Sequence, residues 1–210
     1  MMKYTEKQID DLRLRVGKEM SEKRFIHTLG VEKMAAFIGE KIMPESVDRL
    51  RAAALLHDIS KEYSEAEYLL TFKKHNIKLS DEDKQTPALW HSISAPWVIG
   101  DEFSAFADED ILSAVYNHTV GSPDMSIFDE IILLSDYIEE GRKYRGCIEL
   151  RDSFISELSV AKSIDEAISS LHKAVAISLE NTINALEKRG EFCHSRTKAT
   201  YAWVLAKIKR

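Results

Sequence analysis

The stretch Leu55-Leu56-His57-Asp58-Ile59-Ser60-Lys61 joins an apolar helical run to an adjacent imidazole and carboxylate. A lysine follows the pair by about one helical turn. Imidazole nitrogen and carboxylate oxygen together suit a divalent or trivalent metal ion. The same dipeptide also fits a buried imidazole bonded to its neighbour's carboxylate. The rest of the chain has to decide between these two interpretations.

Composition limits the classes of protein that fit. The chain has 210 residues, 44% hydrophobic residues and a net charge of -6, which suits one compact domain and disfavours non-specific nucleic-acid binding. Cys147 and Cys193 have neither metal-like nor disulfide-like spacing, as expected for reduced thiols in a cytoplasmic protein. The first residues, Met1 to Glu6, lack the apolar stretch of a signal peptide, and no apolar run is long enough for a membrane span.

Helical periodicity covers most of the chain, and strand-like alternation is nearly absent. Capping patterns begin at Thr5, Ser64 and Ser163, while Pro44 and Gly190 predict helix ends. Helices are expected at about 5–20, 22–42, 46–58, from 64, from 87, 109–118, 126–140 and 163–190, followed by a short C-terminal helix. Residues 76–86 and 142–145 are expected to be loops, Pro96 to kink or end its helix, and Leu69 to point inward. The sequence predicts a single all-α domain with a long C-terminal helix, a core at about 22–142 and C-terminal helices at about 163–210.

The histidines fall on helix faces that should meet the core. His27 shares its face with Val31, Met34 and Ile38, and the other polar residues that extend apolar faces in this way are His57, His91, His118 and Asp136. A single such histidine is best interpreted as a satisfied core residue. Four histidines and two aspartates on the inner faces of five helices would be costly to bury unless a shared metal centre bound them. Because no cysteine belongs to the set, iron, manganese or cobalt is favoured over a structural zinc ion.

The order His27, His57-Asp58, His91, His118, Asp136 resembles the arrangement of the HD-domain metal-dependent phosphohydrolases. Within that family, the chain looks most similar to the bacterial symmetrical diadenosine-tetraphosphate hydrolases, the YqeK-type proteins. The segments that carry this resemblance are 24–31, 53–61, 90–92, 118–126, 135–142 and 194–197. The His-Asp pair alone is a weak signal, whereas segments 118–126 and 135–142 together are specific. Ser195, where many relatives are expected to have proline, and Trp90 depart from the pattern.

The resemblance implies an HD-domain helical fold with two metal ions, for which iron is expected and manganese or cobalt are alternatives. By analogy, His27, His57 and Asp136 would hold the first ion, His91 and His118 the second, and Asp58 would bridge both. Two ions about 3.5–4 Å apart can clamp a phosphoryl group and supply hydroxide at neutral pH. The implied reaction is cleavage of diadenosine tetraphosphate into two ADP by a metal-bound hydroxide.

Basic residues near the motifs are candidates to neutralise the polyphosphate. Lys61 follows the His-Asp pair by one turn, Arg24 shares a helical face with His27, and Arg142 follows the helix of Asp136. Asp58 and Lys61 are the candidate catalytic residues. The candidate phosphate-binding residues are Arg24, Lys61, Thr119, Gly121, Arg142, His194 and Arg196. Each basic residue has the alternative interpretation of a solvated surface charge, and His194 and Arg196 have that of a helix-capping role.

Three alternatives remain at this point. The chain could be an HD phosphohydrolase for another nucleotide or phosphate ester, although Ile59-Ser60-Lys61 departs from the HD-x-GK pattern of the cyclic-dinucleotide branch. It could be a nucleotide-binding sensor with little turnover, or a helical scaffold without metal. A small-molecule nucleotide is the expected partner, with neither nucleic acid nor membrane. The sequence leaves both a monomer and a homodimer open.

Overall fold

The computed structural model describes residues 4–209, and these residues form helices without any β-strand. Residues 1–3, which belong to the N-terminal stretch that lacks signal-peptide character, lie outside the described residues. The α-helices are α1 (Glu6–Val16), α2 (Glu22–Ile42), α3 (Val47–Leu56), α4 (Glu65–Lys74), α5 (Asp81–Gln85), α6 (Trp90–Glu102), α7 (Glu109–Asn117), α8 (Ile127–Ile138), α9 (Arg145–Val160), α10 (Ile164–Arg189) and α11 (Ser195–Ile208). Short 3-10 helices are η1 (Pro44–Ser46), η2 (Pro87–Leu89) and η3 (Ser104–Phe106). The predicted all-α fold is confirmed.

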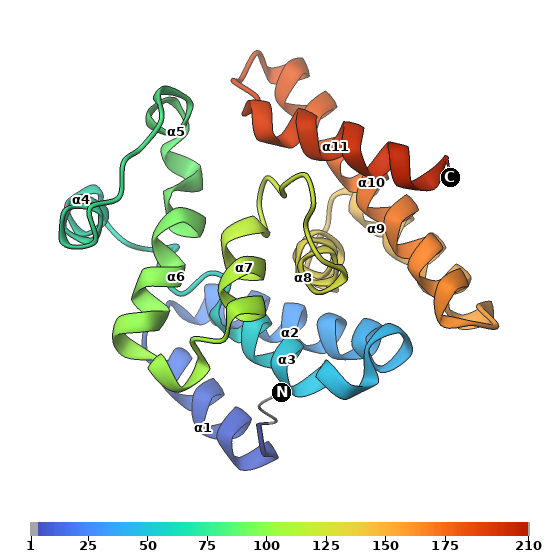
Figure 1. Ribbon diagram of the computed structural model, residues 1–210, viewed down its shortest axis with the longest axis horizontal. Coiled ribbons are helices and arrows are strands. Elements are labelled where there is room, and N and C mark those ends of the chain that lie inside the picture. The colour runs from blue at the N-terminus through green and yellow to red at the C-terminus, as the bar shows by residue number, and fades with distance from the viewer. Residues whose placement is uncertain (1–3, 210) are drawn as a thin grey trace.

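Helix α8 lies at the centre of the molecule. It is seen almost end-on in Figure 1, with α2 and α3 below it, α7 on one side and the C-terminal helices α9 to α11 on the other. Helix α8 is buried nearly all round: Phe128, Ile131, Ile132 and Leu134 are at most 1% exposed, and so is the charged Glu130. Because neighbouring helices pack around it, α8 provides a fixed support for the polar residues near its C-terminal end.

Local sequence signals explain where most helices begin and end. The hydroxyls of Thr5 and Ser64 each accept a hydrogen bond from the third helical residue in reciprocal capping boxes, as predicted. Helix α2 ends at Ile42 before Pro44, and α10 ends at Gly190, which adopts the left-handed conformation with φ 66°. These signals set the lengths of the two long helices.

The predicted loops and one predicted face need correction. Residues 81–85 form α5, which a capping box at Ser80 starts, so the expected loop at 76–86 is interrupted. Arg145 already belongs to α9, a helix that the sequence interpretation missed although buried residues follow helical spacing along it, namely Cys147, Leu150, Phe154 and Leu158. Leu69 is 49% exposed, because only Tyr68 and Phe72 of α4 reach the small cluster around Trp90.

Pro96 does not end its helix. Helix α6 continues from Trp90 to Glu102, with Val98 and Ile99 buried after the proline. An interior proline removes one helical hydrogen bond at a cost of about 3 kcal/mol. Burial of the two apolar side chains beyond it offsets that cost. Within residues 4–209, no helix combines the length and apolar character that crossing a membrane requires.

Candidate metal centre

Five helices bring the predicted ligand-type residues to one place. His27 lies in α2 and Asp136 in α8, His57 and His118 directly follow the last residues of α3 and α7, and His91 is the second residue of α6. The turn after α3 carries Asp58, which is 4% exposed. In this turn, the amide of Lys61 donates to the carbonyl of Asp58, which fixes the backbone between the two residues.

The carboxylate of Asp58 stands between two groups of imidazoles. Its Oδ2 lies 3.8 Å from Nε2 of His27 and 3.5 Å from Nε2 of His57. Its Oδ1 lies 3.4 Å from Nε2 of His91 and 3.6 Å from Nε2 of His118. One carboxylate oxygen therefore faces each pair of rings, as a bridging ligand would.

Asp136 belongs to the first of these groups. Its Oδ1 lies 3.0 Å from Nε2 of His27 and 3.9 Å from Nε2 of His57. Ligand atoms of His27, His57 and Asp136 lie within 4.8 Å of one another, and so do those of His57, Asp58 and His118. Two overlapping groups of donor atoms thus share the same small volume.

Backbone carbonyls orient three of the four histidines. The Nδ1–H groups of His57, His91 and His118 donate to the carbonyls three residues earlier, at 2.6, 2.8 and 2.6 Å. These bonds commit the proton of each ring to Nδ1, so the Nε2 lone pair points into the cluster. A hydrogen bond on the far nitrogen is the usual way to orient a metal-ligating histidine.

The fourth histidine is oriented by a carboxylate that the sequence interpretation missed. Nδ1 of His27 lies 3.2 Å from Oε1 of Glu139, which is 3% exposed. The amide of Gly141 donates to the second oxygen, Oε2. A Cβ at Gly30 would lie 2.5 Å from Oε2, so glycine at that position makes room for the carboxylate. The signal was present, because Glu139 follows Asp136 by three residues near the end of α8.

Protonation of the rings follows from burial and hydrogen bonding. Burial lowers the pKa of His57 to about 4 and holds that of His91 well below its usual value, so both rings are neutral at pH 7. Burial also acts to lower the pKa of His27, but hydrogen bonds to Asp136 and Glu139 outweigh it and raise the pKa to about 9. Neutral imidazoles are the form that binds metal ions.

The carboxylates stay ionised despite their burial. Burial alone would raise the pKa of Asp58 and Asp136, but His57 beside the first and Arg142 beside the second contribute most to holding both values well below the usual range. Burial lowers the pKa of Lys61, whose Nζ lies 3.1 Å from both ring nitrogens of His91. Anionic oxygens and the neutral imidazoles of His57 and His91 therefore meet in one desolvated centre.

Two contacts show that this donor set fits a cation. The buried Nε2 of His57 makes no hydrogen bond. The Nε2 atoms of His91 and His118 lie 3.1 Å apart although both rings carry their proton on Nδ1, so two lone pairs face each other. A buried acceptor without a donor, such as Nε2 of His57, and two lone pairs that face each other are both costly unless a cation satisfies them. The cluster could hold metal ions through nitrogen and oxygen ligands.

Two of the predicted phosphate-binding residues reach the cluster of ligand-type residues. Arg24 Nη1 lies 2.7 Å from Asp58 Oδ2, and Arg142 Nη2 pairs with Asp136 Oδ1, so both reach the centre. Both line a hollow of about 610 Å³ that also contacts His27, Lys23, Lys143 and Tyr144; we call it the basic hollow.

Gly121 and Arg196 contact each other instead of the cluster. Arg196 Nε donates to the Gly121 carbonyl at 2.9 Å, and its guanidinium stacks on Tyr116. The imidazole of His194 caps α11 by accepting from the amide of Arg196 at 3.1 Å. Thr119 directly follows His118 and donates to the hydroxyl of Ser92. The phosphate-binding role of these residues stays a prediction.

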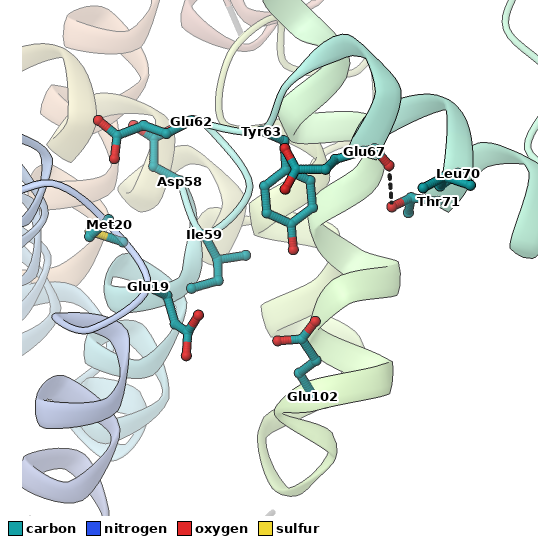
Figure 2. Close-up of a pocket in the computed structure, with 10 residues that line it drawn as sticks. All are labelled: Glu19, Met20, Asp58, Ile59, Glu62, Tyr63, Glu67, Leu70, Thr71 and Glu102. Atoms are coloured by element: carbon teal, nitrogen blue, oxygen red, sulfur yellow. Dashed lines mark hydrogen bonds between the residues drawn. The ribbon is translucent and has the colours of Figure 1, made fainter.

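A further hollow borders Asp58 on its other side. Figure 2 shows Asp58 and Tyr63 at this hollow of about 470 Å³, with carboxylates around it from Glu19, Glu62, Glu67 and Glu102. The dashed line in the figure is the hydrogen bond from the Thr71 hydroxyl to the carbonyl of Glu67, 3.0 Å long. Glu62 also lines the basic hollow, but its charge is outweighed there by lysines and arginines, whereas the described lining of this hollow has neither. A polyanion would therefore meet the centre from the basic hollow.

Comparison with known proteins supplies the family. The sequence profile of the HD domain family matches residues 24–141, which hold all six ligand-type residues. The chain belongs to the HD domain family. The predicted resemblance is thereby confirmed. Helices outside the matched residues pack against them, α1 on α3 and both α9 and α10 on α8.

Individual relatives agree with this assignment. The HD domain protein is 30% identical over 193 residues to a Bacillus subtilis (strain 168) protein named symmetrical bis(5'-nucleosyl)-tetraphosphatase, covering 91% of this chain and 94% of the relative. A Halalkalibacterium halodurans protein of the same name is 29% identical, covering 92% and 95%. A crystal structure from Clostridium acetobutylicum, described as a predicted HD superfamily hydrolase involved in NAD metabolism, is 29% identical with a TM-score of 0.79 and covers 98% of this chain and 100% of its own.

Both departures from the family pattern attach α5 to the rest of the HD domain. The amide and hydroxyl of Ser195 donate to Glu82 Oε2 at 3.0 and 2.6 Å. The indole of Trp90 donates to the carbonyl of Asp83 at 2.8 Å. Proline has no backbone N–H and could not donate this hydrogen bond to Glu82. Serine at position 195 therefore adds a link between α5 and the start of α11.

Proposed function

We propose that this HD domain protein hydrolyses diadenosine tetraphosphate symmetrically. One water molecule adds across the central phosphoanhydride, and the products are two ADP. The observation that carries the proposal is the carboxylate of Asp58, whose two oxygens face separate pairs of imidazoles. The relatives named symmetrical tetraphosphatases give the reaction.

The donor set is suited to two metal ions. His27, His57 and Asp136 would hold one ion, His91 and His118 the other, and Asp58 would contact both. When bound, such a pair supplies Lewis-acid stabilisation of phosphoryl oxygens and an activated water molecule. Imidazole and carboxylate ligands suit iron, which we propose as the metal, with manganese or cobalt as alternatives. A cytoplasmic location and the choice between monomer and homodimer stay predictions.

Basic side chains supply the charge that the polyphosphate needs. Arg24 and Arg142 bring guanidinium groups to the edge of the centre from the basic hollow. Planar guanidinium groups bind phosphate oxygens through paired hydrogen bonds. Lys61 adds an ammonium group next to His91. A phosphate chain at the centre would have these cations near the bond that breaks, which stabilises the charge that builds up.

The decisive experiment is product analysis. Purified, iron-loaded protein is incubated with diadenosine tetraphosphate, and the nucleotides are separated by chromatography. ADP as the sole product, suppressed by a chelator and absent with Asp58→Ala, is the expected result. ATP plus AMP would keep the metal chemistry but overturn the cleavage position. An absence of product with metal bound would favour a sensor or another phosphate ester.

A further inference from the structure

We propose that a hollow beside the metal centre, separate from the basic hollow, binds one adenosine moiety of the substrate. This inference rests on the proposed function. The hollow encloses about 400 Å³, a size typical of small-molecule sites. We call it the base pocket, and its defining residues are Leu89, Thr119, Thr182, Leu186, Phe192 and His194.

The base pocket adjoins the metal centre through shared residues. A smaller space of about 170 Å³ is lined by His118 and Asp136, and it shares Thr119 and Thr182 with the base pocket. Ala88, whose carbonyl orients His91, also lines the base pocket. Only a few side chains therefore separate a phosphate chain at the centre from this pocket.

The lining distinguishes a nucleoside from a phosphate group. Its described lining residues include neither lysine nor arginine, whereas the basic hollow has Lys23, Arg24, Arg142 and Lys143. Leu89, Val120 and Leu186 supply apolar walls, and the ring of Phe192, which is 44% exposed, is free to stack on a base. Apolar walls with an aromatic ring and a few polar groups are typical of sites for flat, uncharged rings.

Three threonine hydroxyls in the lining have already committed their protons. Thr86 donates to the carbonyl of Glu82 at 2.8 Å, Thr119 to the hydroxyl of Ser92 at 3.1 Å, and Thr182 to the carbonyl of Ser178 at 2.8 Å. A hydroxyl whose proton is engaged can still accept hydrogen bonds. These oxygens therefore suit the amino group of adenine and the ribose hydroxyls, which donate, and do not suit phosphate oxygens, which only accept.

The experiment measures ligand binding directly by calorimetry on metal-loaded protein. Phe192→Ala should weaken ADP binding about tenfold, within the range for loss of a base–aromatic contact. Thr182→Val, which keeps the shape and removes the acceptor, should weaken ADP binding about fivefold. Pyrophosphate, which is ADP without its nucleoside, should bind both variants as it binds the wild type. In hydrolysis assays, both variants should raise KM for diadenosine tetraphosphate and leave kcat within about twofold.

Two control variants make the result specific. Trp97→Ala removes an aromatic ring that is also 44% exposed but stacks on His75, away from these hollows, and should change nothing. Tyr144→Ala tests the basic hollow as the rival site for this moiety. Weaker ADP binding with Tyr144→Ala and unchanged binding with Phe192→Ala would overturn the proposal. Equal losses of ADP and pyrophosphate binding with Phe192→Ala would also overturn it.

The outcomes separate this inference from the proposed function. If the wild type binds ADP through Phe192 but releases no ADP from diadenosine tetraphosphate, the base pocket stands and the reaction is wrong. If the wild type forms ADP but both pocket variants bind it normally, the reaction stands and the base pocket is refuted.

Discussion

Replacing Glu139 by glutamine should weaken metal binding by roughly 10- to 100-fold, the usual cost of losing a hydrogen-bond partner behind a metal ligand. The structure gives the reason. Two donors face the carboxylate, with Nδ1–H of His27 at Oε1 and the amide of Gly141 at Oε2. An amide group has one acceptor oxygen and one donor nitrogen, so Glu139→Gln must leave one of these donors facing another donor. The loss corresponds to about 1.4–2.8 kcal/mol of binding free energy.

The assay is a competition between the protein and a chelator for Mn²⁺ or Fe²⁺, with metal content as the readout. Gly30→Ala tests the same contact without changing the charge, because its Cβ would lie 2.5 Å from Oε2 of Glu139 and push the carboxylate away from His27. Glu140→Gln is the matched control, since Glu140 pairs with Lys33 at the surface and its side chain is 65% exposed. Equal metal affinity of Glu139→Gln, Glu140→Gln and wild type would refute the positioning role.

Three further outcomes are expected. Asp58→Ala should abolish hydrolysis and lower metal content in elemental analysis, because the carboxylate between the two imidazole pairs is gone; unchanged turnover would rule out the bridging arrangement. Lys61→Ala should lower kcat roughly 100-fold with metal content unchanged, and a normal kcat would exclude a catalytic role for Lys61. Metal-free protein should lose about 3 kcal/mol of its unfolding free energy between pH 6.5 and pH 4, because the pKa of His57 is about 4 when folded and the unfolded state therefore binds the proton first. Urea unfolding measures this loss, which should be smaller by about 3 kcal/mol with His57→Gln, while the part that comes from the buried ring of His91 remains.

Helical periodicity placed the candidate ligands on the core side of their helices, and the resemblance to HD phosphohydrolases grouped them into one site. His27, His57, His91, His118 and Asp136 continue apolar helix faces, so packing those faces places all five in one centre. Asp58 follows His57 directly, and its position depends on the turn after α3, which the sequence did not specify. The alternative of a bond between His57 and its neighbour does not describe this centre, because the ring proton of His57 goes to the carbonyl of Ala54.

The features that the sequence did not predict correctly have local causes. Glu139 carries no motif of its own, and its role becomes visible only when α2 and α8 pack together. Helix α9 was hidden because Gly146 in its first turn resembles a loop signal. Leu69 was assigned inward by the apolar pattern of α4, a helix that packs mainly on α6 and buries only two of its apolar side chains. Pairing of Gly121 with Arg196 depends on the packing of α11, which sequence spacing does not reveal.

The carbonyl anchors of His57, His91 and His118 affect how this protein can change over evolutionary time. Every residue has a backbone carbonyl, so substitutions at Ala54, Ala88 and Val115 leave the acceptor in place as long as the helices persist. These positions can therefore be substituted while the three rings keep their orientation. His27 alone depends on another side chain, and through it on Gly30. The orientation of three of the four histidine rings is thus insensitive to substitution of the neighbouring side chains, whereas that of His27 is sensitive to it.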